Sequence, residues 1–122
     1  MSSVAVDRRA LGARGESVAA RALLARGYRI LARNVRGRAG ELDLVCRDGD
    51  AFVFCEVKAR RPSAFGDARE ALTPAKRARL CRLAEGYLAR LGRRDAPYRI
   101  ELVAVRLLPD GAPTEVEIVP FD

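Results

Sequence analysis

The chain has 122 residues, 49% of them hydrophobic, so it has the size of one ordinary domain and can bury a core without disulfides or a structural metal. It contains no histidine, which excludes Ser-His-Asp and Cys-His catalysis and zinc sites built on histidine. The net charge of +7 and the isoelectric point of about 10.1 favour an anionic partner, with nucleic acid ahead of an anionic membrane surface.

The N-terminal part of the chain predicts a basic lead-in and then a helix. We expect the lead-in over residues 1–11 and a single domain over residues 12–122, because no repeat or linker interrupts the sequence. Alanines and leucines at helical spacing predict a helix over residues 15–26, which Gly27 ends. Glu16 lies in its first turn, where an acid usually complements the helix dipole.

Strand patterns follow this helix. Tyr28–Ala32 is a predicted strand, and residues 34–39, rich in arginine and glycine, predict a mobile basic loop. Two alternating segments, Glu41–Cys46 and Ala51–Ala59, flank an Asp-Gly pair at Asp48-Gly49. This arrangement is a strong hairpin signal.

The C-terminal half contains a second helix and two more strands. After a loop over residues 60–72, Thr73 as N-cap and a proline at the first helical position predict a helix that continues to about Leu91, where Gly92 ends it. The remaining predicted strands are Tyr98–Leu107 and Glu115–Val119. The order α-β-β-β-α-β-β predicts an α/β fold, a hairpin sheet with helices packed on it.

Charged residues interrupt the two most strand-like segments at Asp43, Glu56 and Lys58. Strand side chains alternate between faces, so Glu56 and Lys58 share a face with their Cα atoms roughly 6.5–7 Å apart. With Asp48-Gly49 at the turn, position 43 should pair near position 54. Asp43 would then be a diagonal neighbour of Glu56, at about 7–8 Å between Cα atoms.

Two carboxylates beside an ammonium group suit a hard divalent cation and phosphodiester chemistry. We expect Asp43 and Glu56 to bind Mg²⁺ or Mn²⁺ through oxygen, with the carbonyl of Val57 as a further ligand. The cation would acidify a bound water and stabilise charge on a phosphoryl oxygen, while Lys58 would orient or help to deprotonate the attacking water. The alternative is a set of ordinary surface ion pairs, each worth about 0–1 kcal/mol.

Two features favour the site over surface ion pairs. The segment AFVFCEVKA is almost continuously apolar, which is typical of a strand buried on both faces, where an unpaired charge is costly. The chain also has 21 arginines and only two lysines, Lys58 and Lys76, so these lysines are candidates for positions that need a compact ammonium group. Lys76 either reaches the same cleft or remains a solvated residue in the first turn of the second helix.

An ordered set of short motifs spans most of residues 12–103. Its members are Gly15-Glu16, Asn34 with its flanking arginines, GELDL at residues 40–44, FCEVKAR at residues 54–60, Lys76 and Tyr87-Leu88. This set resembles the PD-(D/E)XK signature of restriction-endonuclease-like nucleases and, more closely, the YraN-like family of small bacterial proteins.

The resemblance implies a restriction-endonuclease-like α/β core with a mixed central sheet of about five strands and helices packed on it. It also implies that Glu16 joins Asp43 and Glu56 in a catalytic set, with Lys58 as the motif lysine. Glu101 follows Ile100 where Phe-Asp is common in the family, so we assign Glu101 no catalytic role.

The cysteines and the N-terminal sequence indicate the cellular compartment of the protein. Cys46, Cys55 and Cys81 are odd in number, lack C-x-x-C spacing and lie in apolar segments, so we expect reduced, buried thiols. The N-terminus lacks the apolar core of a signal peptide, and no apolar run approaches the about 20 residues of a membrane helix. The sequence therefore predicts a soluble, cytoplasmic protein without a membrane partner.

The leading functional hypothesis is a Mg²⁺- or Mn²⁺-dependent nuclease that acts on DNA, including branched or processed structures. Phe65 is the one exposed aromatic residue that we would consider for base stacking. A second hypothesis is a nucleic-acid-binding module without catalysis. A third is a structural or interaction protein that recruits a partner or forms a homodimer through an edge strand or an apolar helix face. The residues expected to contact phosphates are Arg33, Arg36, Arg38, Arg60, Arg61 and Lys76.

Overall fold

The computed structural model describes residues 8–62 and 68–121, and the predicted order of elements is confirmed in it. Phe65 and the first seven residues of the expected lead-in lie outside the described ranges. The elements are α1 (Arg8–Ala25), β1 (Arg29–Gly37), β2 (Gly40–Asp48), β3 (Ala51–Arg60), a short 3₁₀ helix η1 (Ala68–Ala71), α2 (Pro74–Arg90), β4 (Tyr98–Leu107) and β5 (Pro113–Pro120).

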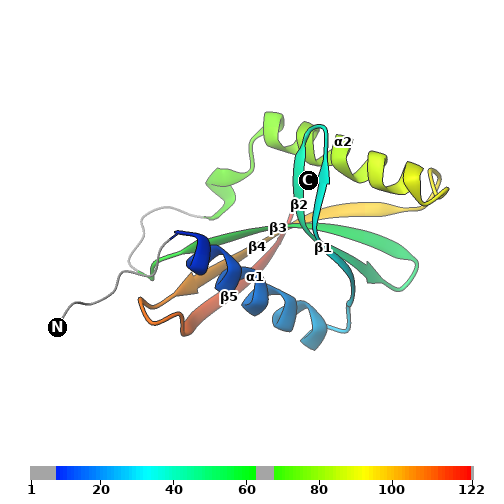
Figure 1. Cartoon of the computed structure of the whole chain (residues 1–122). Helices are drawn as coiled ribbons and strands as arrows, with labels where there is room; N and C mark the ends of the chain where they lie inside the picture. Colours follow the sequence, from blue (N-terminus) through cyan, green and yellow to red (C-terminus); the bar gives the residue numbers. More distant parts are fainter. Residues whose placement is uncertain (1–7, 63–67, 122) are drawn as a thin grey trace.

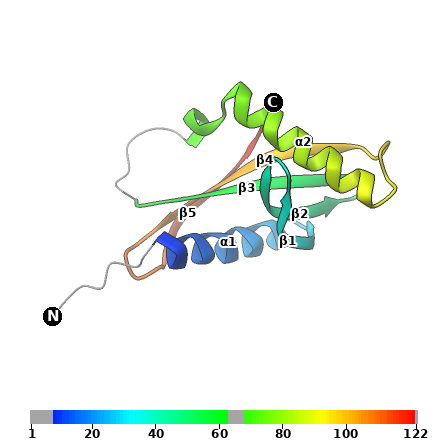
Figure 2. The same cartoon turned by 45° about the horizontal axis from the view of Figure 1, so that its top comes forward.

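The five strands form one mixed sheet in the order β1-β2-β3-β4-β5. β3 and β4 are parallel, and the other neighbours are antiparallel. The chain passes from β3 to β4 through η1 and α2. Figures 1 and 2 show α1 and α2 on opposite sides of the sheet. The predicted α/β fold, with helices packed on a mixed sheet, is therefore confirmed.

Each helix covers its own hydrophobic core on the sheet. The α1 core includes Leu23, Leu44 and Val53, whereas the α2 core includes Phe54 and Leu80. Residues 52–55 of β3 enter both cores, so this part of the central strand is buried on both faces, as its apolar sequence predicted, whereas residues 56–60 are half-buried. Neither helix in the described ranges combines the length and apolar character that crossing a membrane requires.

The ends of the helices follow the predicted signals, with one exception. Gly27 and Gly92 have φ of +94° and +70° just beyond α1 and α2, where glycine is favoured. Thr73 caps α2, because its side-chain oxygen accepts a hydrogen bond from the Lys76 N–H. However, α1 begins at Arg8, so residues 8–11 of the expected lead-in are helical, and Leu11 packs against the α1 core.

The prediction of a basic loop over residues 34–39 is wrong. β1 continues to Gly37, where only a two-residue turn separates it from β2. Val35 pairs with Leu42 and packs into the α2 core, so tertiary packing overrides the local loop signal. Within this strand Asn34 has φ of +52°, a conformation that asparagine tolerates better than most residues.

The predicted hairpin between β2 and β3 is present, but its register differs from the prediction. Asp48 pairs with Ala51, so Gly49 and Asp50 occupy the centre of the turn. Gly49 has φ of +60°, as the first central residue of a type II′ turn requires. Val45 rather than Asp43 therefore pairs with Phe54, a displacement of two residues along the strand.

The helix α1 approaches β3 closely at Gly15, which is buried. A Cβ atom at Gly15 would lie 2.8 Å from the Cβ atom of Ala59, closer than the about 3.5–4.0 Å of an ordinary carbon contact. The absence of a side chain thus lets the helix lie against the strand, which places the next residue, Glu16, at the sheet.

We expect the substitution Gly15→Ala to lower the free energy of unfolding by about 1–3 kcal/mol, because overpacking outweighs the gain in helix propensity. Gly12→Ala is the matched control in the same helix, since no atom lies within 4 Å of its added Cβ. That variant should be as stable as the wild type or up to about 1 kcal/mol more stable. Equal urea midpoints for the two variants, at an unchanged m-value, would contradict the close approach.

Candidate metal centre

The centre of the site is the place where β2 leaves β3. Their pairing extends from Asp48 and Ala51 to Leu44 and Cys55. Beyond it, Asp43 Oδ2 accepts a hydrogen bond of 2.7 Å from the Val57 N–H. The Asp43 carboxylate therefore takes the place that a backbone carbonyl of β2 would have in a continuous ladder. It satisfies the Val57 N–H where the two strands separate.

The backbone of β2 turns at Asp43. In a regular strand Leu42 and Leu44 would share a face. Instead Leu44 belongs to the α1 core and Leu42 to the α2 core. The turn leaves the Asp43 carboxylate between the two layers, where groups from both sides of the sheet approach it.

Three carboxylates converge at this turn. Glu16 from α1 and Glu41 and Asp43 from β2 each offer an oxygen atom, and these oxygens all lie within 4.8 Å of one another. All three residues are half-buried. We call Glu16, Glu41 and Asp43 the acid cluster. Sequence reasoning placed Glu16 and Asp43 in the site and gave Glu41 no role there, although the GELDL motif places it two residues from Asp43.

Asn34 of β1 holds two members of the acid cluster together. The Asn34 amide is placed with its nitrogen toward the acids, the orientation that satisfies both its oxygen and its nitrogen. In this orientation it donates hydrogen bonds to Glu16 Oε1 (3.0 Å) and Glu41 Oε1 (3.1 Å). Arg36 forms an exposed ion pair with Glu41 at 3.5 Å. The sequence offered one signal for this role, an isolated asparagine within a basic segment, but it did not show which groups the amide would contact.

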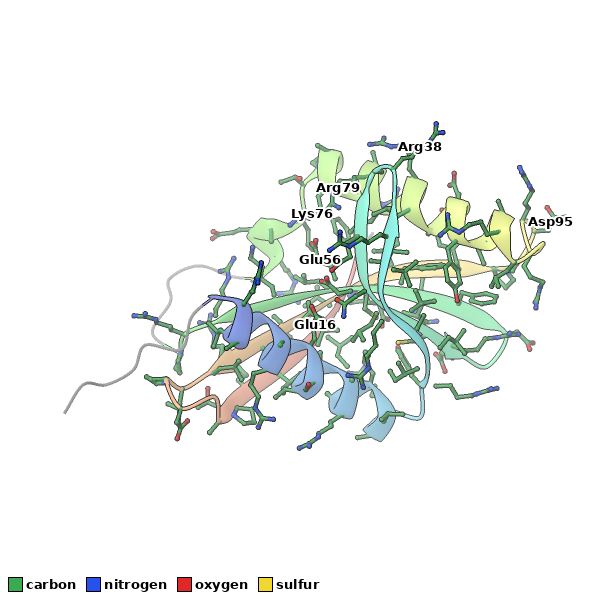
Figure 3. The ribbon with its side chains drawn as sticks, viewed as in Figure 1. Glu16, Arg38, Glu56, Lys76, Arg79 and Asp95 are labelled. Atoms are coloured by element: carbon green, nitrogen blue, oxygen red, sulfur yellow. The ribbon has the colours of Figure 1, made fainter. Side chains whose placement is uncertain are left out.

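Glu56 faces the α2 side and is bound by two cations of that helix (Figure 3). Lys76 Nζ lies 3.0 Å from Glu56 Oε2, and Arg79 Nη2 lies 3.2 Å from Glu56 Oε1. The Glu56 side chain is 15% exposed. Its Oε2 atom is buried, and the Lys76 contact is an ion pair without hydrogen-bond alignment. Lys76 thus contacts a predicted site residue, and Arg79 is a contact that sequence reasoning missed.

Lys58 follows Glu56 by two residues on β3 and therefore points to the same face. It is half-buried, level with Ala104 of β4. In the described part of the chain it forms no ion pair with the acids, whereas Lys76 and Arg79 do so with Glu56. The structure thus places Lys58 beside the site without a direct contact to a carboxylate.

The arginines predicted to contact phosphates form two groups. Arg33, Arg36 and Arg38 are exposed on β1 and at the hairpin turn, close in sequence to Asn34. Arg60 and Arg61 lie at the opposite end of β3 from its hairpin, where the Arg61 carbonyl accepts a hydrogen bond from Arg106.

Burial and like charge perturb the acid cluster. Loss of solvent raises the pKa of Asp43 from 3.8 to about 6, the Val57 hydrogen bond opposes this rise, and the charges of Glu16, Glu56 and Glu41 add to it. Burial also raises the pKa of Glu16, against the hydrogen bond from Asn34. The cluster therefore carries negative charge that the surrounding protein does not fully compensate.

A second buried acid provides a contrast. Glu101 is 4% exposed and accepts hydrogen bonds from Tyr28 (3.0 Å) and from the Arg99 guanidinium (3.0 Å). Arg99 also pairs with Asp48 at 2.7 Å. The negative charge of Glu101 is therefore matched by a cation within the fold.

The family model that matches the chain covers residues 15–105, from Gly15 of α1 to Val105 near the end of β4. Its description is Uncharacterised protein family UPF0102. The chain belongs to this family. The resemblance to the YraN-like family is thereby confirmed, and the family name assigns no activity.

Similar UPF0102 proteins occur in diverse bacteria. One from Symbiobacterium thermophilum is 53% identical over 103 residues, which covers 84% of this chain and 87% of that protein. One from Streptomyces griseus is 50% identical over 107 residues, with 87% and 90% covered. One from Geobacter sulfurreducens is 43% identical over 103 residues, with 84% and 80% covered.

The raised pKa of Asp43 predicts a pH dependence of stability. Between pH 3.8 and about 6 the folded chain retains a proton that the unfolded chain has released, so the free energy of unfolding falls as the pH rises. Asp43→Asn keeps an acceptor for the Val57 N–H and removes the ionisable group. In this variant we expect the free energy of unfolding to decrease less between pH 3.8 and about 6 than it does in the wild type. Chemical denaturation without divalent cations measures the difference.

The control for this experiment is Asp95→Asn, which removes an exposed carboxylate at a distance from the acid cluster (Figure 3). Its stability should follow the wild-type pH curve. Parallel curves for the wild type and Asp43→Asn across the whole window would contradict the buried, destabilised carboxylate.

Proposed function

We propose that this protein is a divalent-cation-dependent nuclease that hydrolyses phosphodiester bonds in DNA. The observation that carries the proposal is the acid cluster, three carboxylate oxygens within 4.8 Å of one another. Ordinary surface ion pairs would place cations between these acids. Here the cations of α2 bind Glu56, and the cluster itself is left with an excess of acids.

The donor set fits a hard cation such as Mg²⁺ or Mn²⁺. These ions take oxygen ligands from carboxylates, carbonyls and water. Glu16, Glu41 and Asp43 would hold the ion, and the carbonyl of Val57 points to the same strand edge as its N–H, which faces Asp43. A bound cation would also remove the mutual repulsion that raises the pKa of Asp43.

When bound, such a cation stabilises negative charge on a phosphoryl oxygen and promotes ionisation of the attacking water. The protein supplies the rest. Asn34 orients Glu16 and Glu41, and Lys76 and Arg79 fix the carboxylate of Glu56. Lys58 would offer an ammonium group to the substrate phosphate or to the attacking water, since no carboxylate in the described residues holds it.

The charge of the protein supports a polyanionic substrate. The net charge is +7, and Arg33, Arg36 and Arg38 expose guanidinium groups on the strand and turn next to Asn34. Such groups contact the phosphate backbone and position it without reading sequence. DNA binding should therefore weaken steeply as the salt concentration rises.

One observation favours a second candidate, a DNA-binding module without catalysis. Glu56, an expected metal ligand, is already neutralised by Lys76 and Arg79. A site in which cationic side chains replace the metal would bind phosphates and would not cleave them. The two candidates differ in one measurable property, cleavage that depends on a divalent cation.

We expect the wild type to bind Mn²⁺ in calorimetry and to cleave labelled branched DNA, with both activities absent in Asp43→Asn. Asn34→Gly keeps the positive φ and removes the amide. This variant should weaken Mn²⁺ binding by about 10–100-fold, the usual cost of losing a partner of a metal ligand. The same assay on RNA of identical sequence tests the choice of DNA.

Asp95→Asn is again the control with matched charge, and it should bind Mn²⁺ and cleave as the wild type does. Cleavage that survives chelation of all divalent cations, or that persists in Asp43→Asn, would overturn the proposed site. Binding of DNA by the wild type without cleavage in Mn²⁺ or Mg²⁺ would establish the second candidate.

A further inference from the structure

A concave feature lies between the tip of the β1–β2 hairpin and α2. It is a cavity of about 540 Å³, within the usual size range of ligand pockets. Residues 37–39 form the hairpin wall, and Arg82, Leu83 and Arg90 belong to the α2 wall. Figure 3 shows Arg38 at the tip of the hairpin, beside this helix. We call this cavity the hairpin–α2 pocket.

Packing fixes the hairpin wall in place. A Cβ atom at Gly37 would lie 3.0 Å from Leu83 Cδ2, so the backbone of the hairpin tip lies directly against the helix. Val35 and Ala39 on either side of the tip pack into the α2 core. The pocket is therefore formed by two anchored elements, both of which belong to the folded domain.

The charge of the pocket has one sign. Its lining includes three guanidinium groups, those of Arg38, Arg82 and Arg90, and no carboxylate. Among residues 8–62 and 68–121 none of the three forms an ion pair. A guanidinium offers paired donors that match phosphate oxygens, so three of them around one cavity suit a phosphate group.

The pocket continues the candidate metal centre along α2. Arg79 contacts Glu56 through Nη2, and its Nη1 lies 2.8 Å from the place of a Cβ at Gly40, the first residue of β2. Arg82 follows less than one helical turn later, and the distance from Arg79 to Arg90 along the helix is about 16 Å. A DNA strand advances about 3.4 Å per nucleotide along a duplex, so this distance corresponds to about five phosphates.

We propose that the hairpin–α2 pocket binds a backbone phosphate of the nucleic acid strand, a few nucleotides away from the bond at the acid cluster. The identity of the polymer rests on the function proposed above. The position of the pocket is independent of cleavage. The strand then follows α2 from Arg79 toward Arg90, and the hairpin covers one side of its path.

The test compares two variants that each lose three positive charges. The pocket variant is Arg38→Gln/Arg82→Gln/Arg90→Gln. The control variant is Arg21→Gln/Arg26→Gln/Arg29→Gln, which changes exposed arginines of α1, of the turn that follows it and of the start of β1. DNA binding is measured in EDTA, with oligonucleotides of graded length and over a range of salt concentrations. Cleavage in Mn²⁺ is measured separately.

The pocket variant should bind long oligonucleotides about tenfold to hundredfold more weakly than the control variant, with a salt slope smaller by about one to two. The difference should disappear for oligonucleotides too short to reach from the acid cluster to the pocket. Equal affinities of the two variants for long oligonucleotides would overturn the proposal. The proposal would also be overturned if the pocket variant lost affinity for inorganic phosphate or a mononucleotide by the same factor as for long oligonucleotides. The pocket would then be a site for a free anion.

These outcomes are separable from those for the nuclease. Weaker DNA binding by the pocket variant, together with a wild type that does not cleave, would uphold the pocket and reject the catalytic proposal. Normal binding and cleavage by the pocket variant, together with loss of cleavage in Asp43→Asn, would reject the pocket and uphold the nuclease. Because the three pocket arginines are exposed, we expect both triple variants to unfold at the wild-type temperature.

Discussion

The hydrogen bond from the Val57 N–H to the Asp43 carboxylate is the interaction on which the arrangement of the site depends. Backbone pairing between β2 and β3 ends at Leu44 and Cys55, so it does not extend to the Val57 N–H. Without any hydrogen-bond partner, this part-buried donor would cost about 1–3 kcal/mol. Asp43 supplies that partner from its side chain, so β2 is free to turn. The turn carries the hairpin tip toward α2 and opens the sheet to Glu16 from the other side.

The cost of this arrangement is electrostatic. A carboxylate that replaces a backbone carbonyl brings a charge into the sheet, and two glutamates beside it make ionisation harder. Elsewhere the fold avoids such a cost, since Glu101 is matched by Arg99 and Glu56 by Lys76 and Arg79. The acid cluster differs from these acids because its negative charge is not matched by cationic side chains to the same extent. Uncompensated carboxylate oxygens that converge are typical of a cation site.

Much of this arrangement could be predicted from the sequence, for physical reasons that particular residues illustrate. Gly27, Thr73 and Gly92 are local signals of helix ends, and each acts as its residue type predicts. The alternation of β3 correctly separated the residues that face α1 from Glu56, which faces α2.

The missed features depend on contacts between distant segments. The Asp48-Gly49 pair is compatible with two turns, and the chain places Gly49 first in the turn, which moves the register by two residues. Asn34 and Val35 look like a loop until the hairpin packs on α2. Glu41 and Arg79 acquire their contacts only when the turn at Asp43 and the helix α2 are both in place.

The pairing of Val57 with a side chain also makes its backbone amide a reporter of the site. Most amides of a central strand donate to backbone carbonyls, whose electron density hardly changes with conditions. The acceptor of Val57 is a carboxylate that is either protonated, ionised or bound to a cation, and each state donates a different electron density to the same hydrogen. A single amide resonance should therefore follow occupancy of the acid cluster in solution, whereas the resonance of Val53, paired with Cys46, stays constant.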